Sequence, residues 1–209
     1  MPEVTKIDPI FAAYGAYWLA LGKFVSTFAD AEVMTTVVLG HFAETSPEVS
    51  QAIFSGARGK DAIAYINRIC EAKHLPVDAD LKSAFAQFQI LTDVRNLILH
   101  NGVRIHGDGL LATNDAMAYF LPRTIKKIPV SAAMLEGMTQ DAETIRIKLI
   151  LFTMKGRSVA HPEGVQRLVA LAARPWLYKS PPQASPPRKT PDKNAAHQRQ
   201  QKSSPKKPK

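Results

Sequence analysis

The sequence predicts an all-α fold: a helical bundle with a short extended or hairpin insertion before the last long helix, followed by a disordered C-terminal tail. Apolar residues recur at spacings of three and four over most of residues 8–174. Residues 103–130 break this pattern and contain the turn sequence Gly107-Asp108-Gly109. Pro, Ser, Lys and Gln dominate the end of the chain. We therefore expect a helical domain over 8–174 and a tail over 179–209.

The first predicted helix is long and has an acidic residue on its apolar side. Its inward stripe begins with apolar residues at steps of three or four, namely Phe11, Tyr14, Trp18, Leu21, Val25 and Phe28. The same spacing continues through Glu32, Thr35, Leu39 and Phe42. A carboxylate on this stripe needs a partner, because burying an unpaired charge is costly.

Capping residues, prolines and glycines mark the next two helices. Ser46-Pro47 predicts the start of a second helix, which is interrupted around Gly56–Gly59 and stops before Pro76. Asp78 or Asp80 then caps a third helix that runs to His100. It ends at Asn101-Gly102, a pair suited to a left-handed C-terminal cap.

Extended structure is expected between the third and fourth helices. The segments VRIH and LLAT flank Gly107-Asp108-Gly109 and predict a short hairpin, and a further extended piece covers Ala118 to Ile128. Ser131 caps a fourth helix, and a last short helix runs from Pro162 to about Ala173.

The basic charge of the protein lies in its tail. The chain has a formal charge of +9, and residues 179–209 contain nine basic residues and one acidic residue, a net +8 that leaves +1 for residues 1–178. Seven of the fifteen prolines and no aromatic residue lie in this tail, so it cannot bury enough apolar surface to become ordered. The tail either supplies non-specific RNA affinity through its Lys and Arg or is a solvated segment without a fixed partner.

Several function classes are disfavoured by composition. Cys70 is the only cysteine, which excludes an internal disulfide and a Cys-based zinc site and fits a reducing cytosol. The remaining histidines show no ligand spacing with carboxylates, so we expect neither a metal nor a cofactor. Lys23 interrupts the longest apolar run before it reaches the ~20 residues of a membrane span. Acidic residues ahead of this run argue against a secretory signal, so we expect a cytoplasmic protein with no membrane partner.

Arg95 lies in the middle of the apolar face of the third helix. At ~100° per residue, Phe88 falls within ~20° of Arg95, whereas Asn96 and His100 are i,i+4 neighbours at the edge of that face. A buried guanidinium needs an acidic partner, and Glu32 is the obvious candidate. The pair is either a core salt bridge alone or part of a site. His100 either caps the last turn or, because imidazole changes charge near neutral pH, performs acid–base chemistry.

The stretch Arg95-Asn96-Leu97-Ile98-Leu99-His100 resembles the R-x(4–6)-H motif of the HEPN superfamily, in which the residue after arginine is typically Asn, Asp or His. Its context, VRNLILHNG late in the third long helix of a helical bundle, is also similar. So is the order of a long first helix with an inward Glu, a Gly-interrupted second helix, the motif helix, a short extended insert and a final helix. The resemblance covers roughly residues 8–157.

This resemblance implies a metal-independent endoribonuclease that acts as a homodimer, with both motifs lining one cleft. In such an enzyme Arg95 would hold the scissile phosphate and stabilise its developing charge. His100 exchanges protons with the ribose 2′-hydroxyl or the leaving 5′-oxygen, and Asn96 orients His100 or binds phosphate. The reaction is transesterification of RNA to a 2′,3′-cyclic phosphate. Many such proteins are toxins, which implies an antitoxin or regulatory protein as a partner, or act in phage defence.

Two other interpretations stay open. The superfamily also contains catalytically inactive dimerisation or ligand-binding modules. Alternatively, the protein associates with nucleic acid through its basic tail. An open, dimer-lined cleft that contains Arg95 and His100 favours the enzyme, and burial of both residues in the core of one protomer favours an inactive module.

Overall fold

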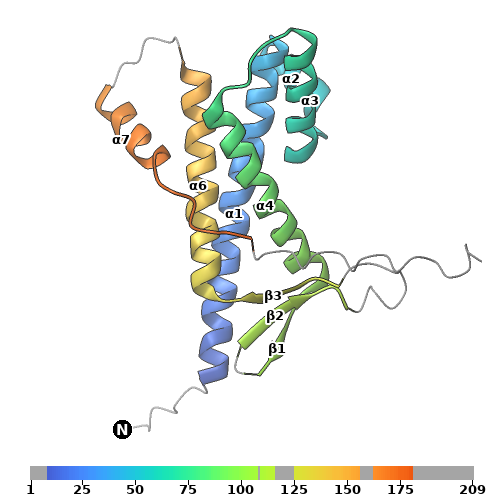
Figure 1. Ribbon diagram of the computed structural model, residues 1–209, viewed down its shortest axis with the longest axis vertical. Helices are drawn as coiled ribbons and strands as arrows, with labels where there is room; N and C mark the ends of the chain where they lie inside the picture. Colours follow the sequence, from blue (N-terminus) through green and yellow to red (C-terminus); the bar gives the residue numbers. More distant parts are fainter. Residues whose placement is uncertain (1–8, 108, 116–124, 156–161, 181–209) are drawn as a thin grey trace, which may run out of the picture. The chain divides into compact units, whose positions relative to one another are not determined.

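The computed structural model describes residues 9–107, 109–115, 125–155 and 162–180 (Figure 1). Six helices and three strands lie in this part of the chain. They are α1 (Pro9–Ala43), α2 (Pro47–Phe54), α3 (Gly59–Ala72), α4 (Ala79–Asn101), β1 (Val103–His106), β2 (Gly109–Thr113), β3 (Lys127–Val130), α6 (Ala132–Met154) and α7 (Pro162–Ala172). The mostly helical fold with a small extended insertion confirms the predicted class.

Three long helices form the body of the domain. Helices α1, α4 and α6 pack together, α2 and α3 lie beside the C-terminal part of α1, and the sheet lies at the other end of the bundle (Figure 1). The core between them contains fully buried aromatic side chains, and the rings of Phe28 on α1 and Phe88 on α4 stack with centroids 4.8 Å apart. This stack joins α1 to α4 at the level of the predicted site.

The predicted helix starts are confirmed because each depends on a local hydrogen bond. The Ser46 hydroxyl accepts from the Val49 amide at 3.4 Å, and the Ser131 hydroxyl accepts from the Met134 amide at 3.1 Å. At the start of α4, the Asp78 carboxylate accepts from two backbone amides. Such caps satisfy amides that have no partner within the helix.

The predicted inward stripe of α1 is partly wrong. Leu21, Phe28 and Leu39 are buried as expected, but the Trp18 side chain is 59% exposed. The core side of α1 instead includes Tyr17 and Phe24, which are 2% and 0% exposed. The spacing could not distinguish these sides, because α1 carries apolar residues at helical intervals on both of them.

The insertion forms a three-stranded antiparallel sheet in the order β1-β2-β3. The predicted hairpin is confirmed, with Val103 opposite Ala112 and Gly107 at a φ of 57°, a backbone conformation that favours glycine. The further extended piece predicted over 118–128 overlaps the start of β3, while residues 116–124 lie outside the described residues. Ala112 and Val130 are buried, so the sheet contributes to the core.

The segment after α7 returns across α6 towards α4 (Figure 1) and ends in a buried polar cluster. Asp141 on α6 is 1% exposed, and its carboxylate accepts hydrogen bonds from the Leu177 amide at 2.8 Å, the Tyr178 amide at 2.8 Å and the Gln87 side chain at 2.7 Å. Gln87 also donates to the Tyr178 carbonyl at 2.9 Å. The carboxylate thereby fixes the point from which the predicted tail begins; the tail itself from residue 181 lies outside the described residues.

In the described part of the chain, no helix combines the length and the apolar character needed to cross a membrane.

Replacing Asp141 with alanine should destabilise the fold by about 3–5 kcal/mol, because it leaves several buried donors without an acceptor. Asp141→Asn preserves the volume but places an amide against backbone N–H groups, so it should also be destabilising. The free energy of unfolding from urea titration measures both effects. Glu136→Ala, at an exposed position of the same helix, is the control. An unfolding midpoint unchanged by Asp141→Ala would contradict the role assigned to this carboxylate.

Candidate functional site

The α4 helix places the predicted arginine against an aromatic ring. Arg95 is half-buried, and its guanidinium carbon lies 5.6 Å from the centroid of the Phe28 ring. A cation over an aromatic face is stabilised by the ring quadrupole. Because Phe28 is itself stacked on Phe88, the position of the Arg95 side chain depends on the core contact between α1 and α4.

The hydrogen bonds of Arg95 leave part of its guanidinium unused. Its Nη1 donates to Asn96 Oδ1 at 3.1 Å. Its Nε is buried and has no acceptor among the described residues. A buried N–H without an acceptor costs free energy, and in native structures it often marks a place where a ligand or water binds.

Glu32 occupies a different position from the one that the sequence predicts. Its Oε1 accepts a hydrogen bond at 3.0 Å from the amide of Gly59, the first residue of α3. A carboxylate is favourable at a helix N-terminus, where amides are unpaired and the helix dipole is positive. Within the described residues no ion pair joins Glu32 to Arg95, so the predicted salt bridge is not formed.

Gly59 makes this arrangement sterically feasible. A Cβ atom at this position would collide with the Phe88 ring and would lie 3.3 Å from Glu32 Cγ. The absence of a side chain lets the start of α3 approach both α1 and α4. This contact could not be predicted from local sequence patterns, because it joins residues 27 positions apart.

His100 lies in the last turn of α4, which ends at Gly102 with a φ of 72°. The His100 side chain is exposed and forms no hydrogen bond or ion pair with the described residues. The predicted contact with Asn96 is not among its interactions, since Asn96 Oδ1 accepts from Arg95. Five residues along a helix correspond to ~140° around its axis, so Arg95 and His100 leave α4 in different directions.

No family model, curated protein or solved structure matches the chain. The assignment of Arg95, Asn96 and His100 as catalytic residues therefore stays a prediction from the motif and its context.

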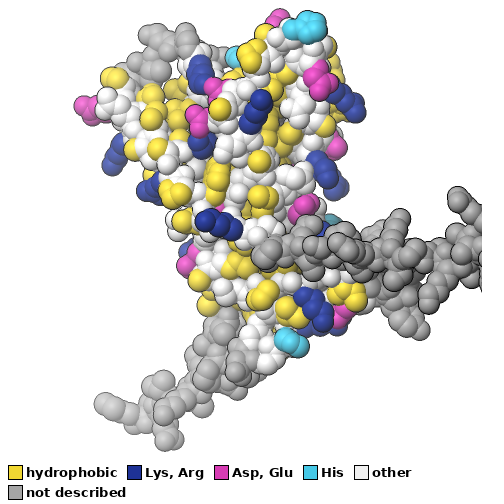
Figure 2. All heavy atoms as spheres, in the orientation of Figure 1, with side chains coloured by type: hydrophobic (Ala, Val, Ile, Leu, Met, Phe, Trp, Pro, Cys, Tyr) yellow, Lys and Arg dark blue, Asp and Glu magenta, His cyan; other side chains and the backbone are white. Residues whose placement is uncertain are grey.

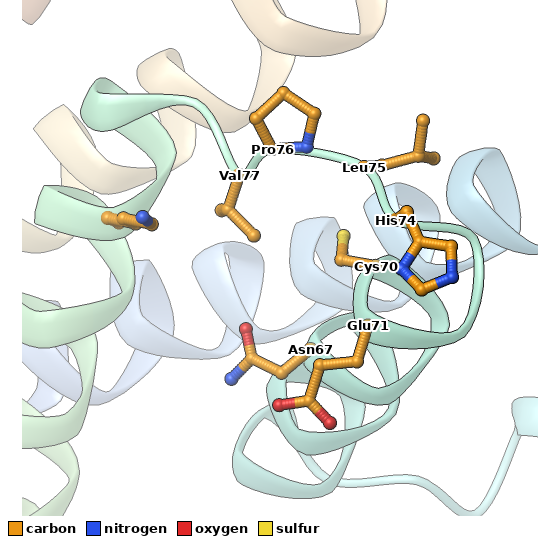
Figure 3. Close-up of a pocket in the computed structure, with 8 residues that line it drawn as sticks. Asn67, Cys70, Glu71, His74, Leu75, Pro76 and Val77 are labelled. Carbon is orange, nitrogen blue, oxygen red and sulfur yellow. The ribbon is translucent and has the colours of Figure 1, made fainter.

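A cavity that the sequence did not predict lies between the end of α3 and the loop that leads into α4 (Figure 3). It has a volume of about 530 Å³ and is lined by Asn67, Cys70, Glu71, His74, Leu75, Pro76, Val77 and Lys82. Burial raises the pKa of the Cys70 thiol, so the sulfur stays protonated and is a poor nucleophile. Two smaller cavities, of about 260 and 290 Å³, lie elsewhere. Arg95, Asn96 and His100 line none of these three cavities.

The described surface mixes charges of both signs. Figure 2 shows Lys and Arg side chains interspersed with Asp and Glu side chains on the face that it presents. Several are paired, including Lys148 with Asp80 at 2.6 Å and Lys155 with Asp78 at 2.6 Å. In the described residues no group of three or more His, Cys, Asp and Glu could hold a metal ion. Long-range attraction of a polyanion would therefore depend on the charge of residues 179–209.

The contacts of Glu32 lead to a testable stability prediction. Glu32→Ala should cost about 1–2 kcal/mol, because it removes the acceptor and the negative charge at the start of α3. A double-mutant cycle with Arg95→Met should give a coupling free energy near zero, since the two side chains form no ion pair. Urea denaturation of the four proteins measures it. A coupling above about 1.5 kcal/mol would restore the salt bridge predicted from the sequence.

Proposed function

We propose that this protein is a metal-independent endoribonuclease of the HEPN type, with Arg95 and His100 as its catalytic residues and Asn96 as a positioning residue. The proposed substrate is RNA, and the product carries a 2′,3′-cyclic phosphate. A toxin- or defence-related role, a cytoplasmic location, and an antitoxin or regulatory partner belong to the same proposal.

The observation that carries this proposal is the state of Arg95. A half-buried guanidinium that served the fold alone would be expected to pair with a carboxylate. Glu32 bonds instead to Gly59, while Arg95 Nε has no acceptor in the described part of the chain. A phosphate oxygen is the acceptor that an arginine fork suits best.

His100 supplies the second requirement, a group that can move protons. Its imidazole is accessible to solvent and has no hydrogen-bond partner among the described residues. In the proposed reaction the ribose 2′-oxygen attacks phosphorus, the bond to the 5′-oxygen breaks, and one proton leaves the former oxygen while another reaches the latter. His100 performs one of these transfers. Arg95 stabilises the negative charge that develops on the phosphoryl oxygens.

The different directions of the Arg95 and His100 side chains determine which chains can contribute to one active site. Arg95 and His100 lie ~140° apart around α4, so they cannot easily meet one phosphate from the same helix. A homodimer that combines Arg95 of one protomer with His100 of the other would solve this problem. The same divergence favours the alternative function, a catalytically inactive HEPN-like dimerisation or binding module.

Cleavage of RNA by the purified protein tests the proposal. EDTA should leave cleavage intact, and Arg95→Ala and His100→Ala should each lower the rate by about 10² or more, as expected for loss of a charge stabiliser or an acid–base group. A 2′-deoxyribose at the cut site should block the reaction, because the attacking oxygen is missing.

His106→Ala is a matched control for His100→Ala, because it removes another exposed imidazole from the same region. Circular dichroism should show that all variants are folded. If a mixture of Arg95→Ala and His100→Ala chains recovers activity, the site is shared between protomers. Cleavage that survives His100→Ala unchanged would refute the catalytic assignment.

Deletion of residues 181–209, which keeps the new terminal carboxylate two residues beyond Tyr178, tests the role assigned to the tail. The melting temperature should change little, because Leu177 and Tyr178 stay in place as donors to Asp141. RNA affinity should fall, and the affinity of the full chain should weaken steeply with salt as counterions compete for the phosphates. Extending the deletion to residue 175 should lower the melting temperature as well, since Asp141 then loses both amides. Equal, salt-insensitive RNA binding with and without the tail would contradict this role.

A further inference from the structure

The outward side of α1 exposes four large apolar side chains. The side chains of Trp18, Leu19, Val33 and Val37 are 59%, 64%, 62% and 47% exposed. Contiguous exposed apolar residues on a soluble protein commonly mark an interaction surface. Leu19 and Val33 lie about four turns apart on α1, and the small residues Gly22, Ser26 and Ala29 are exposed between them.

A regular spacing gives this surface the form of a helix-packing seam. Gly15, Leu19, Gly22, Ser26, Ala29 and Val33 are all exposed and follow one another at alternating steps of four and three residues. We call these six residues the outer stripe of α1. Alternating steps of four and three describe the line along which two helices pack over a long distance.

The glycines of the outer stripe have no role within the described fold. A Cβ atom added at Gly15 or Gly22 would meet no other atom within 4 Å. Glycine is unfavourable inside a helix, so each position lowers helix stability without an intramolecular gain. The close approach of another backbone is a reason for such glycines.

We propose that the outer stripe binds the outer stripe of a second copy of this chain, with the two α1 helices antiparallel. The charges at its edge are self-complementary in this orientation. Lys23 and Asp30 are exposed and lie seven residues apart on the same edge of the stripe. A two-fold axis beside Ser26 places Lys23 opposite the partner's Asp30, and Asp30 opposite the partner's Lys23. A parallel arrangement would instead place the charges of the two copies on opposite edges of the seam, where Lys23 and Asp30 could not pair.

The same axis matches apolar residues. Leu19 lies as far before Ser26 as Val33 lies after it, so Leu19 meets the partner's Val33 across the seam. Gly22 and Ala29 lie between these contacts and allow the two backbones to approach. A patch that fits itself under a two-fold rotation is what a symmetric dimer requires, and this is why a second copy is favoured over an unrelated partner.

This inference is independent of the proposed ribonuclease activity. Ser26 and Phe28 lie ~200° apart around α1, so the outer stripe faces away from the ring that contacts Arg95. Association through α1 leaves Arg95 uncovered, so this contact is separate from the homodimer proposed to combine Arg95 with His100 of another protomer. Loss of the α1 contact removes no residue of the proposed site. Assembly is therefore measured separately from cleavage.

Gly22→Gln is the decisive variant, because it adds bulk to the seam at a position where the fold leaves open space. By sedimentation equilibrium, the wild-type chain should have twice the mass of Gly22→Gln. The unfolding midpoint of the dissociated chain should not fall, since glutamine is a better helix former than glycine. Ala64→Gln places the same side chain on an exposed position of α3 and should keep the wild-type mass. Equal masses for wild type and Gly22→Gln would overturn the proposal.

Charge exchange and cross-linking test the orientation. Lys23→Glu should raise the dissociation constant by about fivefold, and adding Asp30→Lys should restore it. The hydrogen bond to Glu143 is the main reason why the pKa of Arg146 is raised, and Asp30 adds a smaller contribution. In Asp30→Lys, Arg146 therefore keeps its main partner, Glu143, at 2.6 Å. Under oxidation Ser26→Cys should form a covalent dimer, whereas Leu19→Cys should not, because antiparallel packing separates its two copies by about 20 Å. Cross-linking through Leu19→Cys but not Ser26→Cys would exclude the antiparallel arrangement.

Discussion

The hydrogen bonds of Asp141 join parts of the chain that are distant in sequence. A buried carboxylate is unfavourable unless its oxygens are well bonded, and here the donors come from α4 and from the segment after α7. The position of α6, which contacts both α1 and α4, is thereby linked to the path of the last described residues. Trp176 strengthens the same attachment, with its indole N–H bonded to Ser83 on α4 at 3.1 Å. A buried polar contact therefore connects α4, α6 and the segment after α7, and apolar side chains pack around it.

The charged group of Arg95 is hydrogen-bonded less completely than that of Asp141. Both carboxylate oxygens of Asp141 accept hydrogen bonds. Arg95 has the Phe28 face, one amide oxygen and an Nε without an acceptor among the described residues. The difference arises because α3 begins beside Glu32 and uses its carboxylate. The carboxylate that would have neutralised Arg95 stabilises a helix terminus instead. The proposed function assigns an external anion to this guanidinium, and the packing of α1, α3 and α4 is what leaves it without a carboxylate partner among the described residues.

Local features of the fold could be predicted from the sequence, and contacts between distant residues could not. Ser46, Asp78 and Ser131 were identifiable as caps because they bond amides only a few residues away. The stripe of α1 was misplaced at Trp18, since that helix carries apolar residues on both sides and Trp18 lies on the exposed one. Glu32 was correctly recognised as an inward carboxylate in need of a partner. Its actual partner, the Gly59 amide, carries no side chain and so gave no signal in the sequence. The roles of Arg95, Asn96 and His100 depend on the motif alone.

The burial of Cys70 has a practical consequence for studies of this protein. The thiol is 3% exposed and its pKa is raised, while maleimide reagents require an accessible thiolate. Cys70 is also the only cysteine in the chain. A fluorophore or spin label can therefore be attached to one introduced surface cysteine without removing a native residue. The distance between two such labels, measured in solution, would report how copies of the chain are arranged and whether RNA changes that arrangement.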